Sequence, residues 1–517
     1  MSIRNISLPK TLLTLISWSL LVLVANGALG AENLEIDPSR ELFITAVPVV
    51  DDERARDGKV WSFGGLMTSL SGDVAPEAFV RAWASSLIDV QVVNGDPIME
   101  GDKAGQKEEA FFEFFKSWNS RRSCPGLDLE TAPFRLLAIV NRPDLLSISN
   151  GQVTSAGEGR FIYQSVDPSE CDITLPGAGS PERFFVIFEY DLPASSCSEL
   201  KGWHEDWHGL SRFEVESEQY QSALAAITKR FTQPDLSSGR LNGSYLKQVR
   251  SNEFDLVQGL SQFWDLREWN LVGPPGSEAD SSDAVLRSVT TKQTPSFQYL
   301  TKAKRNDELR RWLDLHASEI LAGHHVVGDV LGASESRAFL GGMAINDKHV
   351  QKRLPPTFPP NLFIGGSAWW AEGYSNDPDA LPGEQFVSLD KAKVRHEFAL
   401  QTCSGCHFWE SGTDGFVVSP DTGNSQAFSM VSVRNSGEET RLSPFLTGTD
   451  EFLDLVNARV VNEDGGISQF THEFNDLERR ESVLRRILDL ECEPGVGAAN
   501  PITVLGEIAE EMGTRVH

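Results

Sequence analysis

The stretch VRHEFALQTCSGCH, residues 394–407, is the most specific pattern in this chain of 517 residues. Its last five residues have the form C-x-x-C-H, which is the sequence signature of covalent haem attachment. Cys403 and Cys406 are spaced so that both thiols can bond one haem, and His407 can then bind its iron. Val394 and Phe398 have helical spacing, so a short amphipathic helix should precede the motif. We therefore expect a mainly α, cytochrome c-like domain at this end of the chain.

Two other interpretations of the cysteine pair are open. A structural zinc site would require two further ligands at suitable spacing. A redox-active dithiol is the stronger alternative, because an exported protein can hold such a pair in its oxidised form. A dithiol would not require His407, however, and the motif does not follow an apolar strand. The signature therefore favours one covalent haem c.

The sixth ligand of the iron would decide the chemistry. A second strong ligand gives electron transfer, whereas an open position allows peroxide or oxygen chemistry. Met430 lies 23 residues after His407 and before the last predicted helix, and no other methionine lies in that interval of the sequence. We predict Met430 as the ligand, with His472 and an open position as the alternatives.

The first 30 residues predict a Sec-type signal peptide. Arg4 and Lys10 precede an apolar run over residues 11–24, and the small residues Ala28 and Gly30 precede the expected cleavage point. We therefore expect a periplasmic or secreted protein. The rest of the sequence has no apolar run long enough to cross a bilayer, so no integral membrane segment is expected in the mature chain.

The chain is acidic, with a formal net charge of -28 and a sequence pI of about 4.8. Such a charge repels phosphate, which argues against nucleic acid as a partner. A redox partner protein would be expected to present a basic face.

Four cysteines lie outside the motif, namely Cys124, Cys171, Cys197 and Cys492. In an oxidising compartment they should form two disulfides, and the sequence allows three pairings. A buried strand over residues 184–188 would join the loops that carry Cys171 and Cys197. We therefore favour Cys171 with Cys197, and Cys124 with Cys492.

The length of the chain predicts more than one domain. A Pro- and Gly-rich segment at residues 373–384 is the best boundary, which gives a signal peptide over 1–30, one or more α+β domains over 31–385, and the haem domain over 386–517. The order of strands and helices is irregular in the α+β region, so a mixed or antiparallel sheet is expected. The expected strands cover residues 41–50, 134–140, 160–166 and 184–190, and the expected helices start at 76, 108, 197, 217 and 475.

Several stretches resemble one group of proteins. They are RHEFALQTCSGCH at 395–407, LSPFLTG at 442–448, FNDLERR at 474–480, FRLLAIVNRPD at 134–144 and AGEGRF at 156–161. The group consists of large exported bacterial proteins with a single C-terminal cytochrome c-type motif, and the similarity covers most of the mature chain. Its activity is not established, so the resemblance implies haem and export but no substrate.

The resemblance also bears on individual residues. Members of the group carry a histidine at the position of Met430, and a change from His to Met at an iron ligand would raise the reduction potential. The resemblance further implies a polar cluster of four residues, namely Asn141, Arg142, Glu158 and Arg160.

Three functions are compatible with these observations. The first is electron transfer by an exported c-type cytochrome. The second is a peroxidase-type haem oxidoreductase, and the third is a ligand-binding protein with a redox or structural haem. No nucleophile or nucleotide motif identifies catalytic residues in the region before the haem motif. His204 and His208 are four residues apart, but two histidines without a third ligand are usually core or surface residues.

Overall fold

A computed structural model of the chain describes residues 35–88, 92–93, 96–97, 104–121, 124, 126–169, 171, 181–254, 264–273, 284–289, 315, 317–321, 387–388, 394, 417–419, 424–425, 429–448, 459–461, 467–469, 475–493 and 500–511. The domain boundary predicted at 373–384 and the predicted signal peptide over 1–30 lie outside these residues.

Seven strands form one antiparallel sheet in the order β1-β4-β7-β8-β9-β10-β11. Their bounds are β1 Phe43–Ile44, β4 Phe134–Arg142, β7 Glu158–Val166, β8 Pro181–Asp191, β9 Leu246–Phe254, β10 Trp264–Val272 and β11 Val285–Val289. In the centre of the sheet, Ile187 lies opposite Ile162 on one side and Arg250 on the other. The prediction of an α+β region with a mixed or antiparallel sheet is confirmed, and the sheet is antiparallel.

The remaining strands are short. They are β2 Val92–Val93, β3 Asp96–Pro97, β5 Ser147–Ser149, β6 Gln152–Ser155, β12 Val387–Ser388, β13 Val417–Ser419, β14 Asn424–Ser425, β15 Arg459–Val461 and β16 Ile467–Gln469.

Eleven α-helices lie within the described residues. They are α1 Pro38–Glu41, α2 Val47–Val50, α3 Phe63–Ser71, α4 Pro76–Ile88, α5 Ala104–Asn119, α6 Cys197–His208, α7 Glu218–Thr232, α10 Ala317–Leu321, α14 Pro444–Thr447, α15 Asp476–Leu488 and α16 Pro501–Glu511. The predicted helices starting near 76, 197, 217 and 475 are therefore confirmed, and the helix predicted from 108 lies within α5, which begins four residues earlier. Among the described residues, no helix is both long and apolar enough to span a bilayer.

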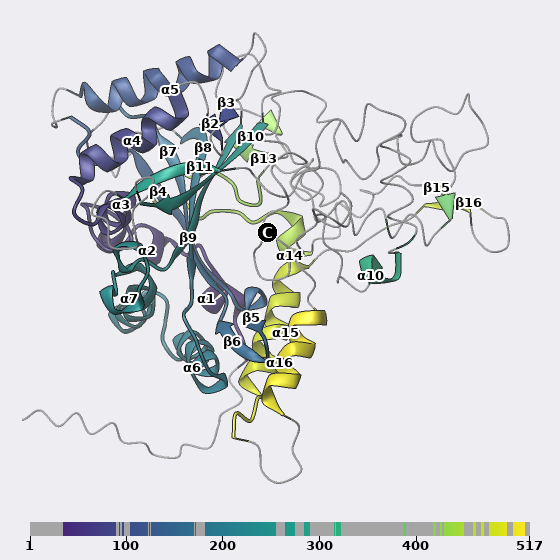
Figure 1. Ribbon diagram of the computed structural model, residues 1–517. Coiled ribbons are helices and arrows are strands. Elements are labelled where there is room, and N and C mark those ends of the chain that lie inside the picture. Colours follow the sequence, from purple (N-terminus) through teal and green to yellow (C-terminus); the bar gives the residue numbers. More distant parts are fainter. Residues whose placement is uncertain are drawn as a thin grey trace, which may run out of the picture. The chain divides into compact units, whose positions relative to one another are not determined.

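The first core lies between one face of the sheet and helices α3 to α7 (Figure 1), and it also includes Val483 and Ile487 of α15 and Leu505 and Ile508 of α16. Alternate side chains of β7 and β8, including Phe161 and Phe188, point into it. Helix α4 contributes Phe79, Trp83 and Leu87, which are four residues apart and so lie on one helix face. Phe63 of α3 stacks on Phe134, with 3.9 Å between the ring centroids. These aromatic side chains are thus core residues.

The opposite face of the sheet carries a second core. Ile162 and Phe185 point to this side, because side chains alternate between the faces of a strand. They pack against a return segment of the chain, residues 429–448, and against α15. The members contributed by these elements are Val431, Val433, Phe445, Leu446, Leu477 and Leu484. Residues nearly 300 positions apart in sequence therefore share one core.

The prediction of a single strand over residues 41–50 was wrong. Only Phe43 and Ile44 pair with β4, while helix α2 follows at once. Pro48 lies in the first turn of α2, where its missing N–H has no cost, whereas in a strand it would interrupt the ladder. The proline therefore ends the strand early.

The favoured disulfide pairing was also wrong, because the structure joins Cys124 to Cys171 and Cys197 to Cys492. Strand β8 runs for 11 residues between Cys171 and Cys197. At about 3.3 Å per residue it separates its two flanking loops by roughly 36 Å. The strand that was expected to bring the two cysteines together instead places them at opposite ends of the sheet.

Candidate functional site

Met430 is the one predicted iron ligand that the structure describes. Cys403, Cys406, His407 and the alternative ligand His472 lie outside the described residues. Of the helix predicted before the haem motif, only Val394 is among the described residues.

Met430 lies at the start of the return segment, half-buried at the edge of the second core. Its backbone carbonyl accepts a hydrogen bond of 2.9 Å from the N–H of Ser443, and Val431 forms a β-bridge with Leu442. The Ser443 hydroxyl donates a contact of 3.5 Å to the Met430 sulfur. This weak contact leaves thioether lone-pair density free, so the residue fits the role of a metal ligand.

Arg434 fixes the return segment to the sheet. Its guanidinium is fully buried and donates to the Leu136 carbonyl at 3.1 and 2.8 Å, and to the Asp51 carboxylate at 2.7 Å. The Gln164 side chain of β7 binds both backbone groups of Arg434, donating to its carbonyl at 2.7 Å and accepting from its N–H at 2.9 Å. Met430 is thus presented from a rigid frame four residues away.

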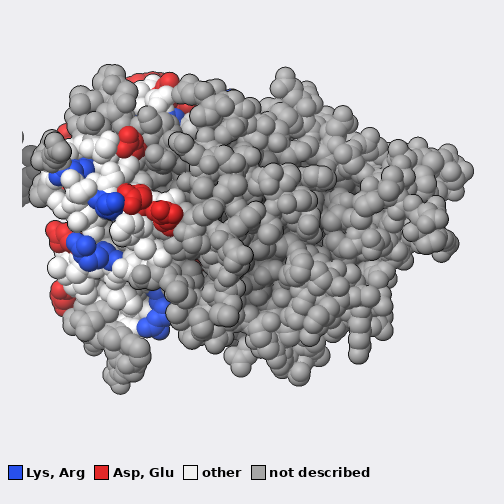
Figure 2. Space-filling view, turned by 90° about the horizontal axis from the view of Figure 1, so that it is seen from above, with Lys and Arg blue, Asp and Glu red and all other residues white. Residues whose placement is uncertain are grey.

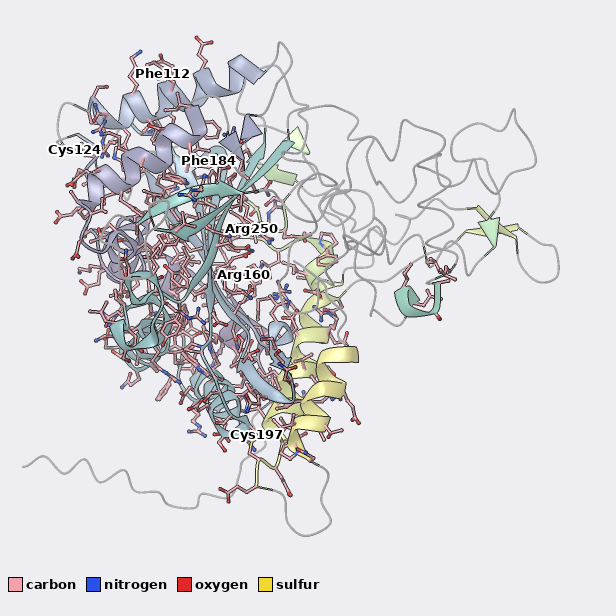
Figure 3. The ribbon with its side chains drawn as sticks, in the orientation of Figure 1. Phe112, Cys124, Arg160, Phe184, Cys197 and Arg250 are labelled. Carbon is pink, nitrogen blue, oxygen red and sulfur yellow. A yellow bond between two sulfur atoms is a disulfide. The ribbon has the colours of Figure 1, made fainter. Side chains whose placement is uncertain are left out.

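A sheet charge array covers the same face of the sheet as the second core (Figure 3). Its members are Glu158, Arg160, Glu189, Lys247, Arg250 and Glu268. Arg160 contacts Glu158 at 2.7 Å and Glu189 at 3.2 Å, and Arg250 lies 3.4 Å from Glu268. Positive and negative groups alternate across strands β7 to β10, so the array compensates its own charge.

The pKa of Glu158 shows how strongly the array is coupled. Burial alone would raise the pKa of this carboxyl, but Lys247 and Arg160 outweigh burial and hold it far below its usual range. Burial likewise opposes the charged form of Lys247, yet Glu158 raises the pKa of this ammonium. Both groups therefore stay charged at neutral pH, and neither is available as a general acid or base.

A second group of charges, the α15 charge cluster, lies where β4 ends and α15 begins. Its members are Arg142, Asp144, Asp476, Arg479 and Arg480. Arg142 donates two hydrogen bonds of 2.8 Å to Asp144. Arg479 reaches the same carboxylate at 2.7 Å, and Arg480 lies 2.6 Å from Asp476. The cluster thereby joins the first helical turn of α15 to the sheet.

The polar cluster that the resemblance implied is only partly reproduced. Arg142 belongs to the α15 charge cluster, while Glu158 and Arg160 belong to the sheet charge array. Asn141 is fully buried, and its side-chain amide has no hydrogen-bond partner among the described residues.

The two histidines with metal-like spacing have separate structural partners. His204 is fully buried in α6 and its Nε2 contacts the Ala156 carbonyl at 2.9 Å, while His208 pairs with Glu41 at 2.8 Å. Burial lowers the pKa of His204 to about 4, so its ring is neutral at pH 7. Within the described part of the chain, no three His, Cys, Asp or Glu side chains converge on a metal-sized space.

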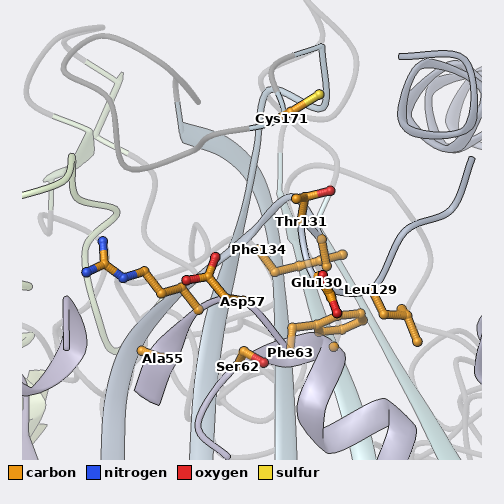
Figure 4. A pocket seen from close by; sticks show the side chains of 12 residues that line it. Ala55, Asp57, Ser62, Phe63, Leu129, Glu130, Thr131, Phe134 and Cys171 are labelled. Carbon is orange, nitrogen blue, oxygen red and sulfur yellow. The ribbon is translucent and has the colours of Figure 1, made fainter. Parts of the chain in front are cut away.

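A small pocket lies beside α3 and the start of β4 (Figure 4). Its lining includes Ser62, Phe63, Glu130, Phe134 and Cys171. The volume is about 30 Å³, which suits one or two water molecules. The pocket is therefore too small for an organic substrate.

The described surface seen from above mixes Lys and Arg with Asp and Glu side chains (Figure 2). On this face the charges are interspersed rather than gathered by sign.

No match was found when the chain was compared with protein-family models, curated proteins and solved structures.

Sequence reasoning missed the α15 charge cluster, although a signal for it was present. Leu477, Arg480 and Leu484 have the i, i+3, i+7 spacing of one helix face. An arginine inside an apolar stripe indicates a buried guanidinium that needs partners. The sheet charge array gave a weaker signal, because its members come from four strands whose pairing the sequence does not specify.

Proposed function

We propose that this chain is an exported c-type cytochrome that carries one covalent haem and transfers single electrons. The observation that supports this most strongly is the C-x-x-C-H sequence at 403–407. In the proposal, Cys403 and Cys406 form the thioether bonds and His407 is the proximal ligand. When bound, the haem would supply a reversible one-electron couple.

The return segment supports Met430 as the second ligand. The buried Arg434 and the Gln164 amide hold the backbone of this segment on the sheet, so the Met430 thioether needs little reorganisation to serve as a ligand. Its side chain is half-buried at the edge of the second core, so it is partly shielded from water. A methionine ligand favours electron transfer at a raised potential over peroxide chemistry.

Export is part of the same proposal. The signal-like residues 1–30 and the two disulfides, Cys124–Cys171 and Cys197–Cys492, both suit an oxidising compartment. We further propose that residues 386–517 contain the mainly α, cytochrome c-like part. The antiparallel sheet would then provide the frame for Met430 and a docking surface for a redox partner protein.

The test is a redox titration of the exported, haem-loaded protein beside a peroxide turnover assay. Electron transfer predicts a reversible one-electron transition, a six-coordinate spectrum in both oxidation states, and no peroxide consumption above that of free haem. Rapid peroxide turnover with a five-coordinate iron would instead identify a peroxidase-type enzyme and refute the proposed function.

A further inference from the structure

The α15 charge cluster contains one more positive than negative group. Three guanidinium groups, those of Arg142, Arg479 and Arg480, face the two carboxylates of Asp144 and Asp476. The Arg480 side chain is only 3% exposed, and the two aspartates are 1% exposed. An unbalanced charge at such depth is costly unless another group neutralises it.

The guanidinium groups that carry the excess positive charge also have N–H donors without a hydrogen-bond partner among the described residues. Nε and Nη1 of Arg480 and Nη1 of Arg479 are buried from solvent and have no hydrogen-bond partner among the described residues. Burial, followed by the nearby Arg142, lowers the pKa of Arg480 to about 10. The guanidinium is still charged at neutral pH, so it requires an acceptor.

Among the described residues, neighbouring acids do not accept from these three N–H groups, although Asp476 Oδ2, which lies 2.6 Å from Arg480 Nη2, also has no hydrogen-bond partner. The next carboxylate along the sheet is Glu158, whose oxygens bind Lys247 at 2.6 Å and Arg160 at 2.7 Å. A water molecule could accept the free N–H groups, but it would leave the net charge uncompensated. A carboxylate would accept the free N–H groups and also neutralise the cluster, because its single negative charge equals the one excess positive charge. A phosphate would bring more negative charge than the cluster lacks.

The cluster borders the region where the proposed haem ligand lies. Arg480 shares one face of α15 with Leu477 and Leu484, which belong to the second core. Met430 packs against the same core. Met430 and the face of α15 that carries Arg480 therefore both border the second core.

We propose that Arg480 and Arg479 form a binding site for one carboxylate group. Two sources have this chemistry, namely a propionate of the haem and a small free carboxylate. The propionate source rests on the proposed function, whereas the free carboxylate does not.

The first experiment measures the midpoint potential of the haem-loaded protein as a function of pH. A propionate at the site predicts that Arg480→Gln lowers the potential and makes it pH-dependent, because the propionate loses its counter-ion and takes up a proton on reduction. Arg480→Lys should restore most of the wild-type behaviour. Arg485→Gln is the matched control on the same helix, since its side chain is 54% exposed, and it should change neither quantity.

The second experiment uses the mature protein produced without haem. Sodium acetate is titrated against sodium chloride and sodium phosphate at equal ionic strength, with the thermal unfolding midpoint and the NMR signal of isotope-labelled acetate as readouts. A free carboxylate site predicts that acetate raises the midpoint and that Arg480→Gln weakens acetate binding by roughly tenfold or more. The NMR signal tests the site in the wild-type protein, so the result does not depend on how well the variant folds.

The two proposals can fail separately. A protein that never incorporates haem would refute the proposed function, and the acetate titration would then decide the carboxylate site alone. The site is refuted when acetate has no specific effect and, in a protein that does incorporate haem, the potential of Arg480→Gln equals that of the wild type. That combination would mean that water or the chain itself satisfies Arg480.

Discussion

Arg434 illustrates how one buried side chain can position another residue. Its guanidinium bonds to Asp51 and to the carbonyls of Val50, Leu136 and Glu438, which belong to three separate parts of the chain. No single neighbour of Arg434 could replace these contacts. Arg434 can therefore position Met430 without contacting the haem itself.

Replacing Arg434 by Met should destabilise the protein strongly. The variant keeps the apolar stem but leaves Asp51 and several carbonyls without their donor, which should cost about 3–5 kcal/mol of unfolding free energy. Arg485→Met, at a largely exposed position on α15, should cost less than about 1 kcal/mol. Denaturant unfolding measures both. Equal losses for the two variants would contradict the role of Arg434 as an anchor.

Met430→Ala tests the predicted sixth ligand. In the haem-loaded protein this change should convert a six-coordinate spectrum to a five-coordinate one and should allow carbon monoxide to bind the ferrous iron rapidly. Leu442→Ala, which truncates a neighbour packed on the same core, is the control and should retain six-coordination. A six-coordinate Met430→Ala protein would transfer the assignment to another residue, and His472 would be the next to test.

At the scale of elements, α15 connects the C-terminal region to the sheet through charge. Burial alone would raise the pKa of Asp476, but Arg480 and Arg479 outweigh burial and lower it to about 2. The folded pKa is below the unfolded value, so the stabilisation is complete above about pH 4 and is lost as the pH falls towards 2.

The shift predicts a specific change in the acid stability of the protein. Asp476→Asn should remove roughly 2 kcal/mol of the stability gained between pH 2 and pH 4. Asp206→Asn, at a side chain that is 52% exposed, should keep the wild-type pH dependence. Urea unfolding at closely spaced pH values is the measurement. If the unfolding free energy of Asp476→Asn depends on pH as strongly as that of the wild type, Asp476 is not the titrating group.

The two disulfides join elements over very different lengths of chain. Cys197–Cys492 closes 295 residues and ties the start of α6 to the residues after α15, whereas Cys124–Cys171 closes 47. The loops do not overlap, so their effects on the unfolded chain are separable. In the chain-entropy account, the longer loop should contribute about 1.5 kcal/mol more stability.

Paired serine variants test this difference. Cys197→Ser/Cys492→Ser should lose more unfolding free energy than Cys124→Ser/Cys171→Ser, as measured by guanidinium unfolding. A larger loss for the shorter loop would show that local packing, rather than chain entropy, determines the effect of these disulfides.

The sequence predicted the elements better than their assembly. Continuous apolar runs identified β4, β7 and β8, and Ser196, Ser217 and Asn475 cap helices where the periodicity predicted them. The disulfide pairing failed because it depends on which end of β8 each cysteine occupies. The Arg434 contacts were not predictable either, because Arg434 and Leu136 are 298 positions apart and no local pattern links them.

At the scale of the whole molecule, one sheet separates two kinds of environment. The face towards α3 to α7 is aromatic and apolar, while the other face combines an apolar core with buried charges and carries Met430. Structural stability can therefore come largely from the first face. The second face is where a cofactor, a carboxylate and a redox partner would meet in the proposed function.

The most direct test of the central claim is the haem content of the exported protein. Protein made with a cytochrome c maturation system is denatured, extracted with acidified solvent and assayed as the pyridine haemochrome, beside Cys403→Ala/Cys406→Ala. We expect one haem per chain that resists extraction from the wild type and is absent from the variant. A wild-type chain without covalent haem, with Cys403 and Cys406 joined to each other, would contradict it and identify a dithiol site.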